Sequence, residues 1–364
     1  MTTAARPDAD LTELLVDRVR AATTRGTALR IVGGDTKRWY GRRVEAEPLA
    51  VAGHTGVLRY DPAELVLTAR GGTPLVEIET LLRAHGQHLP FEPPSFGPTA
   101  TIGGTIATGL AGPGRVARGP VRDQVLGARL LTGDGRVLRF GGEVMKNVAG
   151  YDVSRLLAGS LGVLGVILDV SLKVLPAPVA TRTVRLELDS AGAVEWLADA
   201  AHRGLPLTAS FYADKRFWLR FDGASDAGLD GVCATVGGET LANAAAERLW
   251  RDVREQQHPW FLQAQRRLWR LHVPPNADIR PFDSAGACAF EWHGAQRWLV
   301  DVDRDVAIEI AREAGGHATL FRGEDGMPEV FAPLPPAMLD LQRRVKRVFD
   351  PAGILNPGRL YATL

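Results

Sequence analysis

The stretch PTATIGGTIATGLAGPGRVARGPVRDQVLG, residues 98–127, decides the fold. Its adjacent glycines, Gly103 and Gly104, make it a poor helix and a poor strand, because paired glycines lose backbone entropy in either. The residues that follow are small: Thr105, Ala107, Thr108, Gly109, Ala111 and Gly112. Such a backbone can approach a large anionic or planar ligand closely, with successive N–H groups that hold phosphate oxygens. Taken alone, a Gly-Gly pair is also typical of a surface loop.

A second glycine turn lies earlier in the chain. Residues 28–32 form a short apolar run that predicts a strand, and GGDTKRWYG follows at residues 33–41. A strand that stops at Gly33-Gly34, with Thr36 and Lys37 beyond, predicts another turn that faces phosphate. The spacing matches neither GxxxxGK[ST] nor GxGxxG, so it excludes the P-loop and the Rossmann fingerprint.

Composition limits the class of protein. The chain has 364 residues, 45% hydrophobic and 23% charged, with a formal net charge of +1, which argues against a nucleic-acid binder. Cys233 and Cys288 are the two cysteines, too few for a disulfide framework, a zinc site or an iron–sulfur cluster. The first fifteen residues lack the apolar core of a signal peptide, and no apolar run approaches the ~20 residues of a membrane span. We therefore expect a cytoplasmic protein.

Periodicity predicts an α+β chain in two parts. In the first part it predicts helices at 11–22 and 73–84, the second capped by Thr73 and opened by Pro74, and strands at 49–52, 57–60, 65–69, 125–131, 137–140 and 163–174, the last with alternating faces. Beyond Pro178 lie seven of the eight tryptophans, with strands predicted at 184–188 and 218–221 and helices at 191–201 and 241–254. We expect most of these tryptophans in a core. A basic helix at 339–349 and the turns of DPAGILNPGRLY close the chain.

Three separated motifs together resemble a known family. The first-strand turn, the stretch LPFEPPSFGPTATIGGTIATGL with LRFGGEVMKNVAGYDVSRLLAGSLGVLGV, and the terminal FDPAGILNPGRLY are similar to the vanillyl-alcohol-oxidase, or PCMH-type, FAD-binding family. Within that family they resemble the E subunits of bacterial glycolate oxidase. The likeness covers residues 28–176 and about the last twenty. All three motifs occur in the order that the family has.

The resemblance implies a fold and a set of FAD contacts. Residues 1–176 would form a PCMH-type FAD-binding domain of two α+β subdomains divided near 90–120, residues 177–335 an α+β cap, and residues 336–364 a tail that returns to the FAD domain. Two groups would meet the FAD diphosphate and flavin: Gly33, Gly34 and Thr36 on one side, and Thr99, Ala100, Thr101, Gly103, Gly104, Ala107, Thr108 and Gly109 on the other. Gly165 and Val166 would meet the adenine, and Asn356 the flavin edge.

Two departures from the family pattern affect how FAD is held. Asp35 stands where the family has a third glycine, and its carboxylate would repel a diphosphate unless it turned outward. Some relatives attach flavin covalently through His or Cys. Here no His falls in the first turn, both cysteines lie in the expected cap, and His54 is interpreted as an ordinary surface or turn residue. We therefore expect noncovalent FAD.

The resemblance also implies a function in a complex. Glycolate, or another 2-hydroxy acid, would be oxidised with a second flavin subunit and an iron–sulfur subunit as partners, at the inner membrane only through those partners. The sequence has no HxH, HxxH or HxxxH, so no metal site and no catalytic base are predicted, and His258, His272 and His293 are interpreted as structural. Arg122, Lys146, Asp152 and Arg359 lie in the matched motifs as candidates near the flavin. Two alternatives stay open: a self-sufficient FAD oxidase of hydroxy acids or sugar alcohols, and a nucleotide-binding scaffold without redox turnover.

Overall fold

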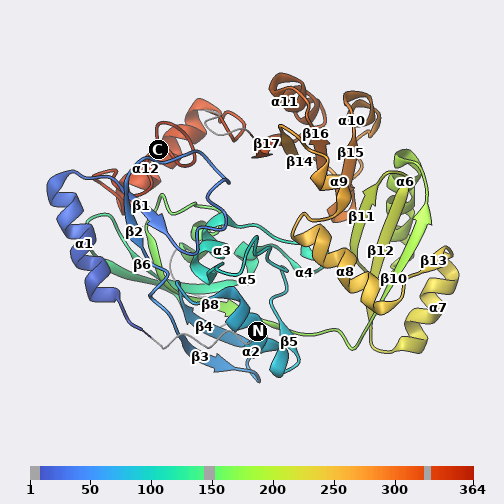
Figure 1. The fold of residues 1–364 in the computed structure, drawn as a ribbon, viewed down its shortest axis with the longest axis horizontal. Coiled ribbons are helices and arrows are strands. Elements are labelled where there is room, and N and C mark those ends of the chain that lie inside the picture. The colour runs from blue at the N-terminus through green and yellow to red at the C-terminus, as the bar shows by residue number, and fades with distance from the viewer. Residues whose placement is uncertain (1–8, 143–151, 324–328) are drawn as a thin grey trace. The chain divides into compact units, whose positions relative to one another are not determined.

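The computed structural model describes residues 9–142, 152–323 and 329–364, and it divides the chain into two compact units (Figure 1). The first unit holds the chain as far as Leu110, then Pro120–Pro176 and Pro333–Leu364; the second holds Ala111–Gly119 and Ala177–Ala332. Residues Ala111–Gly119 thus pack with the second unit, although the sequence analysis placed them in the first domain. None of the helices in the described part of the chain has the length and apolar character needed to cross a bilayer.

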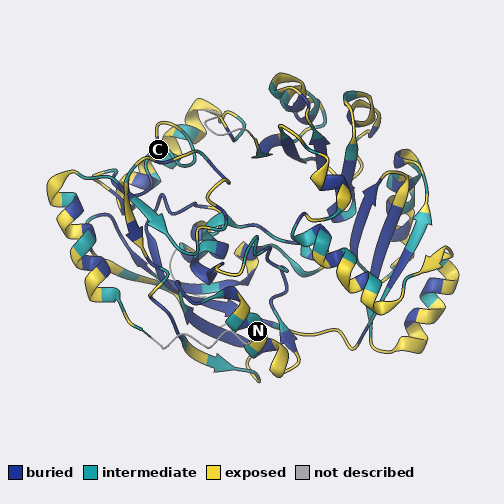
Figure 2. Cartoon of the chain, viewed as in Figure 1, coloured by how far each residue is buried: buried dark blue, intermediate teal, exposed yellow. Residues whose placement is uncertain are grey.

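The first unit is organised around a five-stranded antiparallel sheet. Its order is β3 (Val57–Asp61), β4 (Val66–Arg70), β8 (Val166–Lys173), β6 (Val125–Leu131) and β7 (Val137–Gly141). The strand predictions here are confirmed within a few residues. Strand β8 lies at the centre of the sheet, and both of its alternating faces are buried (Figure 2).

A smaller layer carries the first glycine turn. Strand β1 (Leu29–Val32) pairs in parallel with β2 (Glu47–Ala50), and helix α1 (Thr12–Arg25) shares a core with both strands. That core contains Leu15, Leu49 and Leu355. Because Leu355 comes from the last ten residues of the chain, the terminal tail is part of the layer that positions β1.

Two local predictions fail in instructive ways. Helix α2 (Leu75–Ala84) begins after Pro74, but Thr73 does not cap it: the Thr73 hydroxyl pairs instead with the backbone of Gly56. The segment judged a poor helix contains helix α3 (Ile102–Thr108), with Thr101 at its N-cap and Gly109 as a left-handed C-cap. These two caps and the buried Ile102 and Ile106 outweigh the entropy that two glycines lose.

The remaining short elements of the first unit connect these layers. They are β5 (Gln87–His88) paired with β9 (Leu175–Pro176), helix α5 (Val121–Gln124) and the 3-10 turn η1 (Ser154–Leu157).

The terminal tail is fixed as its turn residues predicted. Helix α12 (Pro336–Phe349) ends at Asp350, whose carboxylate accepts hydrogen bonds from the N–H groups of Ile354 (3.1 Å) and Leu355 (2.8 Å). The buried ammonium of Lys346 donates to Asp350 at 2.9 Å and to the carbonyl of Val163 at 2.9 Å. The hydrogen bond to Val163 joins the tail to the segment that precedes β8.

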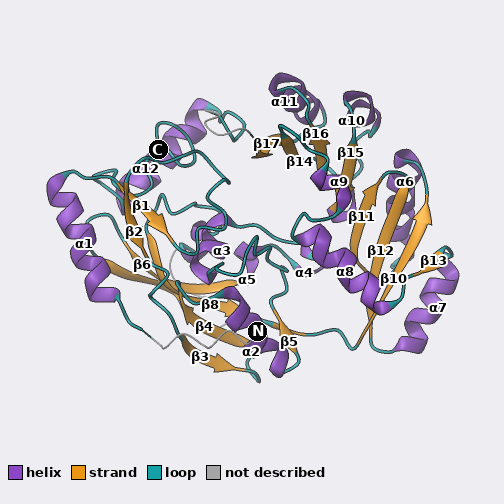
Figure 3. Ribbon diagram, viewed as in Figure 1, coloured by secondary structure: helices purple, strands orange, loops and turns teal. Residues whose placement is uncertain are grey.

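The second unit contains an eight-stranded antiparallel sheet (Figure 3). Its order is β13 (Glu239–Thr240), β10 (Ala180–Glu187), β12 (Arg216–Gly223), β11 (Leu207–Ala213), β15 (Cys288–Glu291), β16 (Gln296–Val300), β14 (Leu268–His272) and β17 (His317–Arg322). The helices are α4 (Arg115–Arg118), α6 (Ser190–Arg203), α7 (Asp226–Val236), α8 (Asn243–Arg254), α9 (Pro259–Leu262), α10 (Arg280–Ala285) and α11 (Arg304–Glu313), with a 3-10 turn η2 (Trp292–Gly294).

The two faces of this sheet differ in character. Helices α6, α7, α10 and α11 pack on one face over a continuous apolar core that includes Phe217, Trp269 and Phe290. Alternate residues of each strand point to the other face, and these residues are aromatic and polar. Helices α8 and α9 cover part of that second face, where the indole of Trp250 donates to Thr183 and Phe261 stacks on Phe211. We call this second face the aromatic face.

Candidate FAD site

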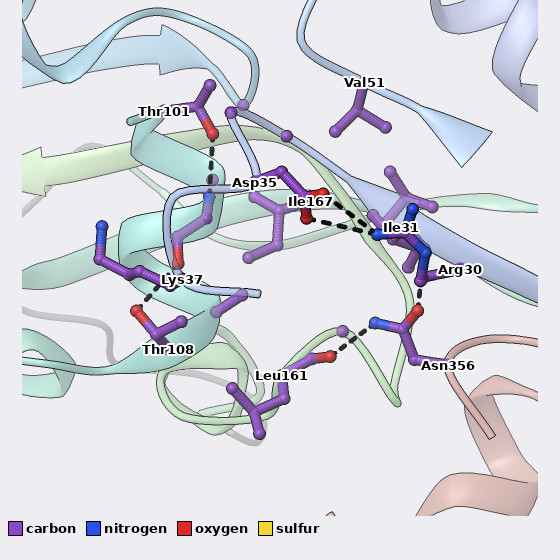
Figure 4. Close-up of a pocket in the computed structure, with 18 of the residues that line it drawn as sticks. Arg30, Ile31, Asp35, Lys37, Val51, Thr101, Thr108, Leu161, Ile167 and Asn356 are labelled. Carbon is purple, nitrogen blue, oxygen red and sulfur yellow. Dashed lines mark hydrogen bonds and ion pairs between the residues drawn. The ribbon is translucent and has the colours of Figure 1, made fainter. Parts of the chain in front are cut away.

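A pocket of about 880 Å³, counted out to the solvent at its mouth, lies in the first unit where the two glycine turns meet (Figure 4). Many residues expected to contact FAD line it: Gly33, Gly34, Thr36, Thr101, Gly103, Gly104, Ala107, Thr108, Gly165, Val166 and Asn356. Three others expected there do not: Thr99, Ala100 and Gly109.

The first glycine turn supplies open hydrogen-bond donors. The backbone N–H groups of Gly33, Gly34, Asp35 and Thr36 have no acceptor among the described residues. Asp35 adopts a left-handed conformation, φ 57°, which turns the backbone between its neighbours. Consecutive N–H groups around a left-handed residue make a concavity that binds anions. This turn therefore has the donor arrangement that a diphosphate requires.

Cationic side chains surround this turn. Arg30, Lys37, Arg38 and Arg359 line the pocket, against the single carboxylate of Asp35. Lys37 is 8% exposed, and its ammonium donates to the carbonyl of Ser95 at 3.1 Å. Since four cations face one anion, the pocket carries the charge that an anionic ligand needs.

The structure shows how the Asp35 carboxylate is accommodated. Its Oδ1 lies 3.3 Å from the Arg30 guanidinium, an ion pair in which Asp35 keeps 37% of its side chain exposed (Figure 4). Arg359 is held rigidly nearby, because it donates to the carbonyls of Tyr40, Arg38 and Arg42. Burial lowers the pKa of Arg359 to about 10, which leaves it charged at neutral pH.

The second glycine turn uses its donors differently. The N–H of Ile102 donates to the carbonyl of Thr73 at 3.0 Å, and that of Gly103 to the carbonyl of Gly71 at 2.8 Å. The N–H of Gly104 donates to the Thr101 hydroxyl at 3.3 Å, the cap of α3. The donors expected to face phosphate here are therefore paired within the protein, and a contact of Gly103 or Gly104 with FAD stays a prediction.

Close packing of the two turns explains why two of these positions are glycine. A Cβ at Gly34 would lie 1.6 Å from the carbonyl oxygen of Thr99, and a Cβ at Gly103 would lie 2.8 Å from that of Gly71. Thr99 also donates its hydroxyl to the carbonyl of Gly34 at 2.8 Å. Thr99 therefore does not line the pocket but holds the two turns together.

The third side of the pocket comes from the tail. The Asn356 side chain is 6% exposed; its Oδ1 accepts from the N–H of Ile31 at 2.8 Å and its Nδ2 donates to the carbonyl of Leu161 at 2.7 Å (Figure 4). Both ends of the amide are occupied in joining β1 to the loop before β8. The structure therefore gives Asn356 a positioning role, and the expected contact with the flavin edge stays a prediction.

Sequence reasoning missed several lining residues: Arg30, Ile31, Arg38, Val51, Gly71, Leu161, Gly162 and Ile167. One of them had a usable signal. Gly71-Gly72 follows the predicted strand at 65–69, as Gly33-Gly34 follows its own strand. The apolar members carry no such signal, because a buried Ile or Val at a strand end looks like any core residue.

The other candidates from the matched motifs divide three ways. Arg359 lines the pocket, as described, whereas Arg122 on α5 does not. Asp152 accepts from the hydroxyl of Ser154 and the N–H of Arg155 and so fixes the turn η1. Lys146 lies outside the described residues.

One of the histidine interpretations needs correction. His54 is 1% exposed and not a surface residue; its Nδ1 accepts from the N–H of Leu11 at 3.0 Å. His272 and His317, far apart in sequence, are neighbours across β14 and β17, with Nδ1 of His272 3.3 Å from Nε2 of His317. His258 caps α9 by accepting from the N–H of Trp260, a structural role. The described residues contain no group of three or more metal-ligating side chains.

The tryptophans of the second unit are mostly buried, as expected. Exposure is 7% or less for Trp218, Trp250, Trp260, Trp269, Trp292 and Trp298. Trp196 is half-buried and packs against Phe217. These residues account for much of the aromatic face and of the core beneath the helices.

Comparison with known proteins identifies the family. The FAD binding domain model matches residues 9–141, and the model for the C-terminal domain of FAD linked oxidases matches residues 323–360. Glycolate oxidase subunit GlcE of Escherichia coli (strain K12) is 44% identical over 98% of this chain and 99% of its own length. Glycolate oxidase subunit GlcD of Bacillus subtilis (strain 168) is 25% identical over 84% of this chain and 77% of its own.

A solved structure agrees with the expected fold class. An alkyldihydroxyacetonephosphate synthase structure superposes with a TM-score of 0.68 at 14% identity, over 95% of this chain and 74% of that one. The PCMH-type α+β fold predicted from the motifs is thereby confirmed, as is FAD as the cofactor of the family. The chain belongs to the family of FAD-dependent oxidoreductases that includes the E subunit of glycolate oxidase.

Proposed function

We propose that this chain is the FAD-binding subunit of a complex that oxidises glycolate, or a related 2-hydroxy acid, to the 2-oxo acid. The observation that carries the proposal is the first glycine turn, where four consecutive N–H groups without an acceptor among the described residues face a pocket lined by four cations. An identity of 44% over nearly the whole length of a glycolate oxidase subunit supports the choice of reaction.

The residues present fit FAD. We assign its diphosphate to the N–H groups of Gly33–Thr36, with the charges of Lys37 and Arg38 beside it. Ala107 and Thr108 on α3 are small enough to let a flat ring approach, and Gly165, at φ 159°, leaves backbone accessible for the adenine. When bound, FAD would supply the redox chemistry, and the residues of this chain would hold it, neutralise its charge and orient it.

We propose noncovalent attachment. The residues that line the pocket include neither His nor Cys, the two residue types that link flavin covalently in the family. Cys233 and Cys288 lie in the second unit. In keeping with the expected domains, the first unit is assigned the FAD and the second the role of cap.

The partners belong to the same proposal. The chain contains two cysteines, too few for a four-cysteine iron–sulfur cluster of its own, so transfer of flavin electrons through such a cluster would need another subunit. We propose a second flavin subunit and an iron–sulfur subunit as partners, and a cytoplasmic complex that meets the inner membrane only through them.

One purification and one reconstitution test this function. The full chain should be yellow, and acid precipitation should leave FAD in the supernatant; flavin that pellets with the protein, or FMN, contradicts the assignment. Expressed alone, the chain should give background glycolate oxidation with an artificial acceptor, and activity should appear with the flavin and iron–sulfur subunits. Full turnover by the lone chain would establish the self-sufficient oxidase, and a flavin that stays oxidised in the active complex would establish the scaffold.

A further inference from the structure

A second polar cluster lies on the aromatic face of the second unit, in a row across four neighbouring strands. His317 (β17) is opposite His272 (β14), which is opposite Gln296 (β16), which is opposite Glu291 (β15). Figure 1 shows these strands side by side. Glu291 and Gln296 are 4% and 3% exposed, His272 is half-buried and His317 is exposed. The row therefore runs from a buried carboxylate to an imidazole at the surface.

Hydrogen bonds fix the proton positions along this row. The Gln296 amide donates to Glu291 Oε1 at 2.7 Å, so its carbonyl oxygen faces His272 Nε2 at 3.0 Å. A carbonyl can only accept, and therefore His272 carries its proton on Nε2 and presents a lone pair on Nδ1. That lone pair accepts from Nε2 of His317, 3.3 Å away. Neutral His317 then has its own lone pair on Nδ1, at the exposed end of the row.

Positive charge surrounds the same two imidazoles. Burial lowers the pKa of His272 well below its usual value, and the charges of Arg270 and Arg115 lower it further. Although His317 is exposed overall, partial desolvation of its ring and then the charge of Arg270 lower its pKa. Both rings are thus neutral at pH 7. The one carboxylate of the row, Glu291, is occupied by the Gln296 amide and by the Trp298 indole at 2.8 Å.

The backbone beside the cluster is strained. Trp292 and His293 have φ values of 54° and 55°, unusual for bulky residues, and strain of this kind gathers at functional sites. His272 stacks on the Trp292 ring, with centroids 5.4 Å apart. The Arg115 guanidinium lies 4.4 Å from the centroid of the same Trp292 ring. The Trp292 indole donates to the carbonyl of Gly112 at 3.0 Å, so the segment that carries Arg115 is tied to this cluster.

We propose that Arg115, Arg270, His272 and His317 form a binding site for a small 2-hydroxycarboxylate. The two guanidinium groups attract its carboxylate, and the lone pair on Nδ1 of His317 accepts a hydrogen bond from its hydroxyl. His272, held by Gln296 and Glu291, is a positioning residue that keeps His317 in the tautomer with that lone pair. The inference rests on the proposed function, since it names the substrate class and places its recognition in this chain rather than in a partner.

Binding to the full chain tests the site directly. Glycolate, acetate and ethylene glycol are titrated by calorimetry. Glycolate should bind with a 1:1 stoichiometry and at least tenfold more tightly than acetate, which lacks the hydroxyl, and ethylene glycol should not bind. Equal affinity for glycolate and acetate, or no binding of glycolate, would overturn the proposal.

Variants distinguish recognition of the hydroxyl group from recognition of the carboxylate. His317→Ala should reduce glycolate affinity to that of acetate, whereas Arg115→Gln should weaken both ligands at least tenfold. His202→Ala and Arg280→Gln are matched controls, since both residues are exposed in the same unit, and should change nothing. Nitrogen NMR of the wild type gives a second measurement: glycolate, not acetate, should shift His317 Nδ1. A preference for glycolate that survives His317→Ala contradicts the proposal.

The failure of this site and the failure of the proposed function can be told apart. If glycolate binds as described but the reconstituted complex is inactive, the site stands and the function is wrong. If the complex oxidises glycolate at the wild-type rate with His317→Ala and Arg115→Gln, and the lone chain binds no glycolate, the function stands and the site is wrong.

Discussion

The two glycine turns of the first unit look alike in sequence and behave differently in the structure. At Gly33–Thr36 the N–H groups have no acceptor among the described residues, whereas at Ile102–Gly104 each N–H already has one. The first turn comes at the end of a strand, where the ladder stops; the second begins a helix, whose first donors are satisfied by a cap and by preceding carbonyls. A glycine pair therefore indicates that other atoms come close to the backbone. The structure around the pair determines whether those atoms belong to a ligand or to the protein itself.

The largest effect is expected at Gly34. A Cβ there would lie 1.6 Å from the Thr99 carbonyl oxygen, and backbone cannot yield that much without separating the two turns. Gly34→Val should lower the free energy of unfolding by more than about 3 kcal/mol and abolish flavin binding. Thermal unfolding and the flavin content of the purified protein measure both.

Gly231→Val is the matched control for this change. Gly231 lies in helix α7 of the second unit, where a Cβ would meet nothing within 4 Å. The control should keep its flavin and unfold near the wild-type temperature. Normal stability in Gly34→Val would show that the turns are not packed as described.

A separation of stability from binding is expected at Gly104. A Cβ there would approach only the Thr101 hydroxyl, at 3.2 Å, and the rest of a side chain would extend into the pocket. Gly104→Val should therefore fold, with a stability within about 1 kcal/mol of the wild type, and lose most of its flavin. Full flavin occupancy in this variant would mean that FAD does not pass the start of α3.

Lys37 should affect binding through its charge and through the hydrogen bonds that its ammonium donates to Ser95 and Thr36. Its ammonium lines the pocket from beneath the first turn, and Met fills similar volume without the charge. Since a hydrogen bond to a charged group is worth ~1.5–3 kcal/mol, Lys37→Met should weaken FAD binding roughly 10–100-fold. Fluorescence titration of the flavin-free protein with FAD measures this, with the exposed Lys215→Met as control. An unchanged affinity would place the diphosphate away from this turn.

Much of the fold could be predicted from sequence because its signals are local. The alternation of β7 and the Thr-Gly-Asp-Gly turn before it predict a hairpin whatever lies around them. The helix α3 could not be predicted from propensity, because its stability comes from Ile102 and Ile106, which are fully buried by other segments. Burial of this kind depends on residues distant in the chain.

The same distinction between local and long-range signals applies to the site residues. Glycines and the terminal Asn356 stand out in the sequence, and the structure gathers them at one pocket. The pairing of His272 with His317 left no trace in the sequence, because it depends on the register of two antiparallel strands. The same holds for the ion pair of Arg30 with Asp35, which needs the left-handed turn at Asp35 to form.

The smallest effect is expected at Asp35, and it tests whether the carboxylate in the first turn opposes or assists FAD binding. The ion pair with Arg30 is partly exposed, so removing it should change stability by less than about 1 kcal/mol. Asp35→Asn keeps a residue that tolerates φ 57° and removes the charge, whereas Asp35→Gly also removes the strain of a side chain there.

Both variants should bind FAD a few-fold more tightly, because a carboxylate leaves the edge of the phosphate site and Arg30 is released toward it. The gain should shrink as salt rises, since exposed charges are screened. Titration of the flavin-free variants at low and high ionic strength measures it. Weaker binding by Asp35→Asn would instead show that the carboxylate serves the site by orienting Arg30, and Asp35→Gly, which lacks that partner as well, would then be weakened at least as much.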